Sequence, residues 1–368
     1  MYNKPIFRPS FGNRPDSLVG RDEIINRIVE GLQSYPGSSE RATLIIGQRG
    51  MGKTALLLDL SDRSRSLGYI AVRVTCGENM LDNLIELLQR EGSAYIKDNK
   101  SSIKGFSAGA LGFSFGLTFT EEAQRTFGFR VKLQMICEKL ATCGKRVLIL
   151  VDEVDPSILQ MRELATAYQE LIGSETDIAI IMAGLPTAIS NTLNYRTLTF
   201  LNRSQQISLG LVPVTEVEFY YRSAFERASL MADNDIIKKA ALATDGFPYK
   251  IQLIGYYLSK LSIEGKALTL KDLNKANEAA SEEVELKVFD AMLNPLSDMD
   301  INFLTAMARI DGKIRISDIE NSLGITHGTA QTYRRRLLDA GIISSPRRGE
   351  LEFTMPQLSE YLLKQDLA

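Results

Sequence analysis

The sequence predicts an α/β protein with three parts: a three-layer core around a parallel sheet, an α-helical domain, and a C-terminal winged-helix domain. Three observations predict this architecture. A glycine-rich segment, residues 47–54, lies between an apolar, β-branched run and a stretch of strong helix formers. A second apolar run, residues 146–153, ends in two carboxylates. After residue 296, three helical patterns are followed by a two-stranded turn pattern.

Residues 47–54 form a complete G-x-x-x-x-G-K-T phosphate-loop motif. The residues before it are typical of a buried strand, and those after it favour a helix. In this context backbone N–H groups surround phosphate oxygens, Lys53 supplies positive charge for the β- and γ-phosphates, and Thr54 offers a hydroxyl to Mg²⁺. We therefore expect ATP or ADP to bind at Gly47, Gln48, Arg49, Gly50, Met51, Gly52, Lys53, Thr54 and Ala55.

Residues 146–153 comprise a basic residue, five apolar residues and two carboxylates, as in a central parallel strand buried on both faces. Adjacent carboxylates repel each other and resist desolvation, so propensity alone does not place them at the end of a buried strand. Asp152 is expected to hold Mg²⁺ through its water shell, and Glu153 to polarise the attacking water. The sequence thus predicts Lys53, Asp152 and Glu153 as catalytic residues, with Thr54 and Asp152 as the magnesium site.

Bulk composition narrows the possible functions. At 368 residues the chain fits two or three domains, and its net charge of −2 gives no global attraction to nucleic acid. Three cysteines without a C-x-x-C pair argue against a disulfide framework, and a single histidine, His327, nearly excludes histidine-based metal sites. No apolar run of membrane-spanning length and no signal-peptide core occur, so we expect a cytoplasmic protein without a membrane partner.

The other core elements follow from hydrophobic periodicity. A helix is expected to begin at 21–23, after the proline- and glycine-punctuated residues 5–20. Strands are predicted at 69–74, 178–183 and 207–209, and helices at 81–88 and 161–171. Strands that alternate with helices in this way form a three-layer core, which we expect to span residues 1–212.

Residues 111–119 alternate apolar residues with small or polar ones, which predicts a half-buried strand. We expect it to pair with residues 106–110 as a β-hairpin inserted into the core at about 104–120. The hairpin could cover an edge of the core. Its glycines could equally make it a mobile contact surface for DNA or a neighbouring subunit, and the sequence leaves both interpretations open.

Residues 213–295 show only helical periodicity, interrupted at 245–248, which predicts an α-helical second domain. In residues 296–368, helices are predicted at 298–308 and 316–323, followed by a third that Thr326 caps and that ends at 340–341. Residues 342–345 and 350–354 are expected to form a two-stranded wing. A helix-turn-helix with a wing is a DNA-binding architecture.

The positive charge of this tail is local. Residues 327–348 contain five arginines and one aspartate, although residues 296–368 hold nine basic and ten acidic residues. Ala330, Tyr333 and Leu337 are expected on the inner face of the third helix. The other face and the wing turn are predicted to contact double-stranded DNA through Thr326, His327, Gln331, Arg334, Arg335, Arg347 and Arg348. The alternative is a winged helix that binds a protein, with its arginines solvated or ion-paired.

Taken together, the motifs resemble AAA+ ATPases of the archaeal and eukaryotic replication-initiator type and their STAND signalling relatives. The resemblance rests on residues 18–21, 47–54, 147–153 and 246–248 and on the winged-helix tail. It implies a P-loop NTPase core with a helical lid, and it places Val19, Gly20 and Arg21 at the adenine base. It also implies that a lid cation sensing the γ-phosphate would be Lys250, and that a trans-acting arginine would be Arg196 or Arg203.

Two departures from this family pattern point to slow hydrolysis. The fourth core strand ends without a polar sensor residue unless Thr187 takes that place, and Lys250 lacks the fork of an arginine. We expect an ATP-controlled DNA-binding protein that can self-associate with ATP, either initiator-like or a helper in DNA remodelling or element mobility. The alternative is a STAND-type ATP-dependent signalling switch whose winged helix contacts a protein partner.

Overall fold

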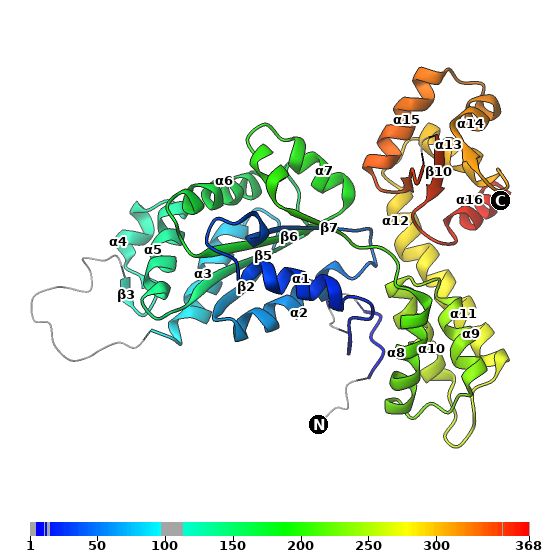
Figure 1. Ribbon diagram of the computed structural model, residues 1–368, viewed down its shortest axis with the longest axis horizontal. Coiled ribbons are helices and arrows are strands. Elements are labelled where there is room, and N and C mark those ends of the chain that lie inside the picture. The colour runs from blue at the N-terminus through cyan, green and yellow to red at the C-terminus, as the bar shows by residue number, and fades with distance from the viewer. Residues whose placement is uncertain (1–4, 11, 13–14, 97–112, 348, 368) are drawn as a thin grey trace, which may run out of the picture.

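The computed structural model describes residues 5–10, 12, 15–96, 113–347 and 349–367. The molecule is elongated: an α/β core forms one end, and a helical lid and a winged-helix domain lie one above the other at the other end (Figure 1). Arg348 and residues 104–112 of the predicted hairpin lie outside the described residues. Within the described ranges, no helix has the length and apolarity needed to cross a membrane.

A five-stranded parallel sheet of order β2-β5-β6-β1-β7 forms the centre of the core. Its strands are β1 (Ala42–Ile46), β2 (Tyr69–Thr75), β5 (Arg146–Asp152), β6 (Ile178–Gly184) and β7 (Gln205–Ser208). β5 and β6 are apolar and buried along nearly their whole length, because helices cover both faces of the sheet. The end of β1 is paired with Gly184 on one side and Ser208 on the other, which places the phosphate loop at the carboxyl edge of the sheet.

Helices on both sides complete the predicted three-layer core. α1 (Asp22–Leu32) and α2 (Lys53–Ser66) pack on one face. The opposite face is covered by α3 (Met80–Ser93), α5 (Phe129–Ala141) and α6 (Leu159–Gly173). The shorter core helices are η1 (Ser39–Arg41), α4 (Glu121–Thr126), α7 (Pro186–Asn194) and η3 (Thr199–Arg203). This arrangement confirms the α/β architecture expected from the alternation of strands and helices.

The expectation of one strand over residues 111–119 is wrong. The chain turns at Gly116, whose φ is +52°, so that β3 (Phe113–Phe115) pairs antiparallel with β4 (Thr118–Phe119). The rings of Phe113 and Phe119 stack with centroids 4.7 Å apart and are buried in the core. Alternating apolar residues fit a strand and a tight hairpin equally well, and Gly116 permits the turn. The expected partner, residues 106–110, lies outside the described residues.

The lid consists of α8 (Val214–Arg227), α9 (Asn234–Ala243), α10 (Pro248–Leu261) and α11 (Leu270–Val284). The last of these continues through a π-helical turn, η4 (Glu285–Phe289), into α12 (Asp290–Leu293), which leads to the winged helix. The N-terminal segment, which the sequence pattern placed with the core, is anchored in the lid. Phe7 is 2% exposed and packs edge-on against Tyr220, Tyr221 and Phe225.

The last domain has the predicted three helices and wing, with two additions. Its helices are α13 (Asp298–Ala308), α14 (Ile316–Leu323), α15 (His327–Asp339) and α16 (Leu358–Asp366). The sheet is three-stranded, in the order β8 (Ile314–Arg315), β10 (Glu350–Phe353) and β9 (Ile343–Ser344). Neither α16 nor β8 was predicted from the sequence; a strand of two residues is too short to show a period.

Candidate nucleotide-binding site

The phosphate loop joins β1 to α2 and contains two glycines in the left-handed conformation. Gly50 has φ +78° and Gly52 has φ +87°, a region in which other residues are strained. A Cβ on Gly50 would lie 2.6 Å from the ring of Phe247, because the start of α10 packs directly on the loop. Glycine at position 50 therefore permits the left-handed turn of the loop and leaves room for the lid to pack closely against it.

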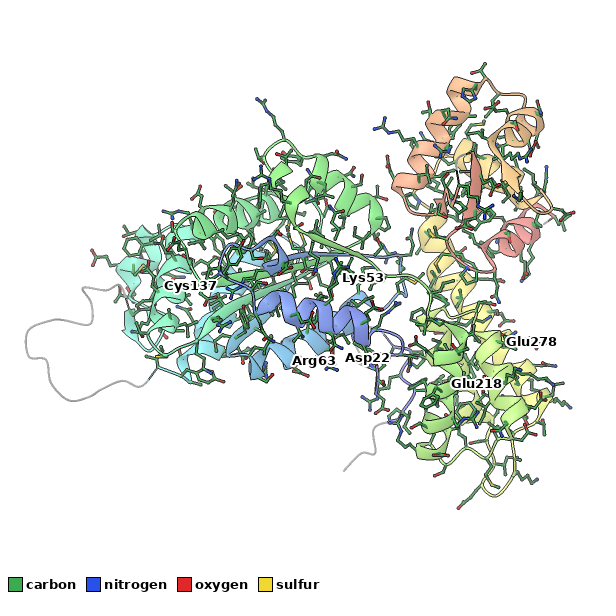
Figure 2. The ribbon with its side chains drawn as sticks, in the orientation of Figure 1. Asp22, Lys53, Arg63, Cys137, Glu218 and Glu278 are labelled. Carbon is green, nitrogen blue, oxygen red and sulfur yellow. The ribbon has the colours of Figure 1, made fainter. Side chains whose placement is uncertain are left out.

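Lys53 opens α2 at the end of the core that faces the lid (Figure 2). Its ammonium group donates hydrogen bonds to the carbonyl oxygens of Gly47 (2.8 Å) and Gln48 (3.0 Å). Burial lowers the pKa of Lys53 to about 8, although the nearby Asp152 acts in the opposite direction. A partly buried cation bonded to two backbone carbonyls is well suited to bind phosphate oxygens.

The two adjacent carboxylates after β5 occupy different environments. Asp152 is 4% exposed, and its carboxylate lies 3.4 Å from the guanidinium of Arg73. Glu153 is exposed and has φ +56°, an uncommon value for a residue other than glycine. Its N–H donates to the side chain of Asp152 at 3.1 Å. Backbone strain of this kind clusters at functional sites.

A cleft of about 280 Å³ lies between the phosphate loop, the N-terminal segment and the lid. It brings together the two carboxylates predicted to be catalytic and most of the predicted loop. The predicted residues that line it are Val19, Arg21, Arg49, Gly50, Met51, Gly52, Lys53, Thr54, Ala55, Asp152 and Glu153. Gly47 and Gln48 do not line the cleft: Gly47 donates its N–H to Gly184, and Gln48 turns toward the winged helix.

Leu18, Val19 and Arg21 line the side of the cleft next to the lid, whereas the predicted residue Gly20 does not line it. Arg21 is 7% exposed, and its guanidinium donates to the carbonyl oxygen of Gly210 at 2.5 Å. Burial lowers the pKa of Arg21, with Glu216 acting in the opposite direction. Gly20 packs against Val212, where a Cβ would approach to 2.7 Å. Arg21 and Gly20 therefore fasten this segment to the connection between core and lid.

Lys250 is not at the cleft. Its side chain is 1% exposed, and its ammonium group lies 3.0 Å from the amide oxygen of Gln357 in the winged-helix domain. The Gln357 amide in turn donates to Asp245 at 2.8 Å. Burial lowers the pKa of Lys250, and Asp245 acts in the opposite direction. Lys250 thus joins the lid to the last domain instead of facing the phosphate loop.

Three other predicted residues also lie outside the cleft lining. Thr187, on α7, is exposed, and so are Arg196 and Arg203 beyond it. Conversely, Lys287, Gln252 and the N-terminal residues 8–10 line the cleft but were not predicted from the sequence. Lys287 lies in the π-helical turn, where the 3.6-residue period is broken, so periodicity gives no sign of the direction it faces.

Oxygen donors in the cleft fit a nucleotide-bound Mg²⁺. The hydroxyl of Thr54 and the carboxylate of Asp152 both line it, next to the loop that would hold phosphates. Hard oxygen ligands of this kind are those that Mg²⁺ prefers, usually with water and phosphate oxygens completing the shell. The donor set is therefore compatible with the magnesium site expected from the sequence.

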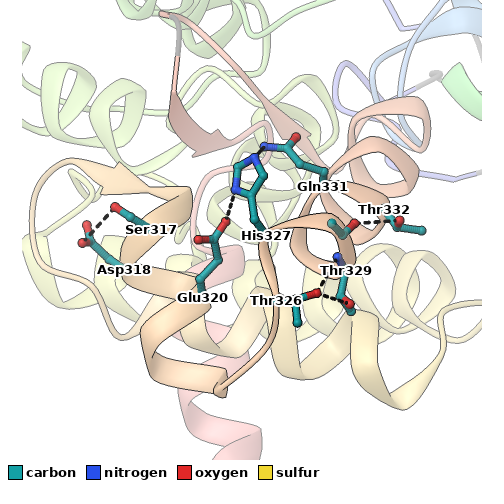
Figure 3. Close-up of polar contacts among 9 residues, drawn as sticks. Ser317, Asp318, Glu320, Thr326, His327, Thr329, Gln331 and Thr332 are labelled. Atoms are coloured by element: carbon teal, nitrogen blue, oxygen red, sulfur yellow. Dashed lines mark hydrogen bonds and ion pairs between the residues drawn. The ribbon is translucent and has the colours of Figure 1, made fainter.

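The predicted DNA-binding residues on α15 are mostly exposed. His327 lies between Glu320, at 2.7 Å, and Gln331, at 3.5 Å, and Thr326 caps the helix through its hydroxyl (Figure 3). Arg335 and, in the wing, Arg347 are exposed. Arg334 is half-buried and donates to Ser345 at 3.1 Å, so it also fixes the wing to the helix.

The opposite end of α15 lies against the core. The amide of Gln48, in the phosphate loop, donates to the carbonyl oxygen of Ala340 at 2.6 Å. A Cβ on the neighbouring Gly341 would lie 2.6 Å from Pro186, the first residue of α7. The phosphate loop therefore touches the winged-helix domain directly.

Comparison with protein families assigns two parts of the chain. Residues 36–193 match the AAA domain family. Residues 286–362 match a domain family of unknown function, DUF8462. No curated protein matches the sequence.

Solved structures resemble the chain over nearly its whole length. A Walker-type ATPase of Pyrococcus abyssi matches with a TM-score of 0.69 and 16% identity, covering 98% of this chain and 99% of that one. The ORC2 protein of Aeropyrum pernix, solved as ADPNP–ADP complexes, matches with a TM-score of 0.62 and 12% identity, covering 98% of each chain. At these identities the similarity establishes the fold.

Proposed function

We propose that this chain, whose residues 36–193 form an AAA domain, hydrolyses ATP slowly and uses its nucleotide state to control DNA binding by the winged helix. The observation that carries the proposal is the hydrogen bond between Gln48 and Ala340. It joins the loop expected to hold phosphates to the helix expected to enter the major groove. A change in the phosphate loop can therefore act on the winged helix without an intermediary.

The arrangement of the cleft supports the nucleotide part of the proposal. Lys53 and the loop N–H groups would hold the phosphates, and the exposed Glu153 would polarise water. Thr54 and Asp152 would hold Mg²⁺, which when bound neutralises phosphate charge. The ORC2 protein of similar fold was solved with ADPNP and ADP. Hydrolysis is expected to be slow because Thr187 lies outside the cleft lining, away from the position of a polar sensor.

The exposed half of α15 supports the DNA part. Gln331 and Arg335 lie on the side of the helix away from the buried Ala330 and Leu337, and Arg347 extends the basic surface into the wing. Arginine and glutamine are the side chains that most often read base edges and phosphates. This surface remains open while the other end of α15 touches the core, so docking and DNA contact are compatible.

Self-association belongs to the same proposal. Arg196 and Arg203 are exposed and lie outside the chain's own cleft lining. In an assembly, either would be a candidate to stabilise charge on the nucleotide of a neighbouring subunit, as trans-acting arginines do in related phosphoryl-transfer enzymes. ATP-dependent assembly would then follow from an incomplete site that a second copy completes.

One pair of contacts favours a second function. Gln48–Ala340 and Lys250–Gln357 both hold the winged helix against the rest of the molecule. Such contacts suit a signalling switch that stays closed until nucleotide exchange, with the winged helix contacting a protein partner. The two functions differ in one respect that can be measured, which is affinity for DNA.

The proposal is tested by the affinity for random-sequence duplex DNA over a salt series. Wild type is expected to bind at low salt with an affinity that falls steeply as salt rises. Arg334→Ala with Arg335→Ala should weaken binding about tenfold or more and lower the salt slope by about one for each arginine that no longer neutralises a phosphate. The matched control, Lys271→Ala with Lys275→Ala on lid helix α11, removes the same charge and should bind as wild type does.

If wild type binds no DNA at low salt in any nucleotide state, the DNA part of the proposal is wrong and the switch is favoured. Unchanged affinity in the α15 variant would move the DNA-binding surface to another part of the molecule. ATP binding should persist in both variants, because neither pair of residues lines the cleft.

A further inference from the structure

A π-helical turn between lid and winged helix directs one cation into the cleft. η4 (Glu285–Phe289) interrupts the continuous helix formed by α11 and α12, and such insertions are frequent at functional sites. Within this turn, Lys287 and Val288 line the cleft. Among the described lid residues that line it, Lys287 is the only charged one; Lys250 is committed to Gln357.

The present partner of Lys287 can release it at low cost. The carboxylate of Glu283 accepts from Lys287 and also from the hydroxyls of Tyr249, at 3.0 Å, and Tyr257, at 2.6 Å. Two donors would remain if the ammonium group left, so Glu283 would not become an unpaired buried charge. The Lys287 side chain is 42% exposed, which gives its flexible stem room to move.

The cluster around Glu283 also lies next to the phosphate loop. Tyr249 lines the cleft, and its Cβ lies 3.0 Å from where a Cβ on Gly50 would be. The lid therefore presents a mobile ammonium group close to the loop that would hold several phosphate charges. A phosphate chain would offer the ammonium group several negative charges, whereas Glu283 offers one that is already shared with two hydroxyls.

We propose that Lys287 is the lid cation that binds the phosphate chain of the nucleotide, exchanging Glu283 for phosphate oxygen when ATP enters. This assignment rests on the proposed function, namely that the cleft binds ATP. It replaces Lys250 in the role that the resemblance suggested.

The helix on both sides of Lys287 is bonded to the winged-helix domain, from the π-helical turn and from the first residue of α12. Glu285 pairs with Lys364 of α16 at 2.7 Å, and Asp290 accepts from the hydroxyl of Tyr361. A shift of Lys287 toward phosphate would therefore move η4 and α12, the helical segments that hold α16. The π-helical turn gives the nucleotide a second route to the winged helix, separate from Gln48.

The test compares the dissociation constants of ATP for three variants by a fluorescence titration. Lys287→Ala should weaken ATP binding about tenfold, which corresponds to about 1.4 kcal/mol, because it removes a charge-assisted hydrogen bond to phosphate. Glu283→Gln removes the competing carboxylate charge and should bind ATP at least as tightly as wild type. Lys275→Ala, an exposed lysine of the same lid helix, is the matched control and should have no effect.

Unchanged ATP affinity in Lys287→Ala, with binding abolished in Lys53→Ala, would overturn this inference and leave the proposed function standing. Failure of wild type to bind ATP would overturn both. A decrease in affinity in Glu283→Gln as large as that in Lys287→Ala would show that the pair only maintains the lid, which also contradicts the exchange.

Discussion

Lys53 combines two properties that make nucleotide binding depend on pH. Its ammonium group is partly buried at the phosphate loop, and this desolvation lowers its pKa from 10.5 to about 8. Only the charged form attracts phosphate. Bound phosphates would stabilise that form, so above pH 8 binding must be accompanied by proton uptake.

ATP affinity is therefore expected to fall as pH rises through about 8, by about tenfold for each unit above it. The free energy of unfolding changes in the opposite sense. Between about 8 and 10.5 the unfolded chain holds a proton on Lys53 that the folded chain lacks, so the cost of burying this charge is progressively relieved and the free energy of unfolding rises with pH. ATP titrations over this pH range measure the affinity, and denaturant titrations measure the free energy of unfolding. An ATP dissociation constant that stays flat to about pH 9.5 would contradict the assignment of Lys53.

At the residue scale, the chemical role of motif residues could be predicted from the sequence, but the direction in which individual side chains point could not. The phosphate loop and Asp152-Glu153 are recognisable because their residue types serve one chemistry at fixed spacing. Lys250 and Lys287 differ instead in the way their helices face, and a π-helical turn decides that for Lys287. Similarly, Arg334 reaches back to Ser345, a contact that helical periodicity does not specify.

At the element scale, the N-terminal segment shows how long-range packing overrides a local pattern. Residues 5–20 are rich in proline and glycine, a composition that predicts an irregular part of the core. Phe7 instead fills a site in the lid beside Gly255, where a side chain would collide with its ring. Arg8, Pro9 and Ser10, which follow, line the cleft. The sequence cannot reveal this because the partners are more than 200 residues away.

Phe7→Ala should lower the free energy of unfolding by about 3–5 kcal/mol, since it removes a buried ring that contacts three others. It should also weaken ATP binding, because the segment that follows would lose its anchor. Tyr35→Ala is the matched control: Tyr35 is 75% exposed and should change little. Denaturant unfolding and ATP titration measure the two effects. A decrease below about 1 kcal/mol would mean that this ring does not fix the N-terminal segment.

At the scale of the whole molecule, one continuous apolar cluster runs from a face of the sheet through the lid to the winged helix. The order core, lid and winged helix could be predicted because each part has its own periodicity. Their docking could not, because it depends on pairs such as Gln48 and Ala340, which are 292 residues apart. Contacts between residues so far apart in the sequence do not affect the local hydrophobic periodicity from which the elements were predicted.

In the proposed mechanism, the nucleotide state reaches the winged helix through the phosphate loop. DNA affinity with ATP, with ADP and without nucleotide reports this coupling, for wild type, Gln48→Ala and the exposed control Gln33→Ala. We predict that ATP tightens DNA binding about tenfold in wild type and in the control, a coupling of about 1.4 kcal/mol. In Gln48→Ala this ratio should decrease clearly while ATP still binds, and what remains of it is the share transmitted by the separate Lys287 route. Equal DNA affinity of wild type in all three nucleotide states, with ATP binding verified, would contradict the mechanism.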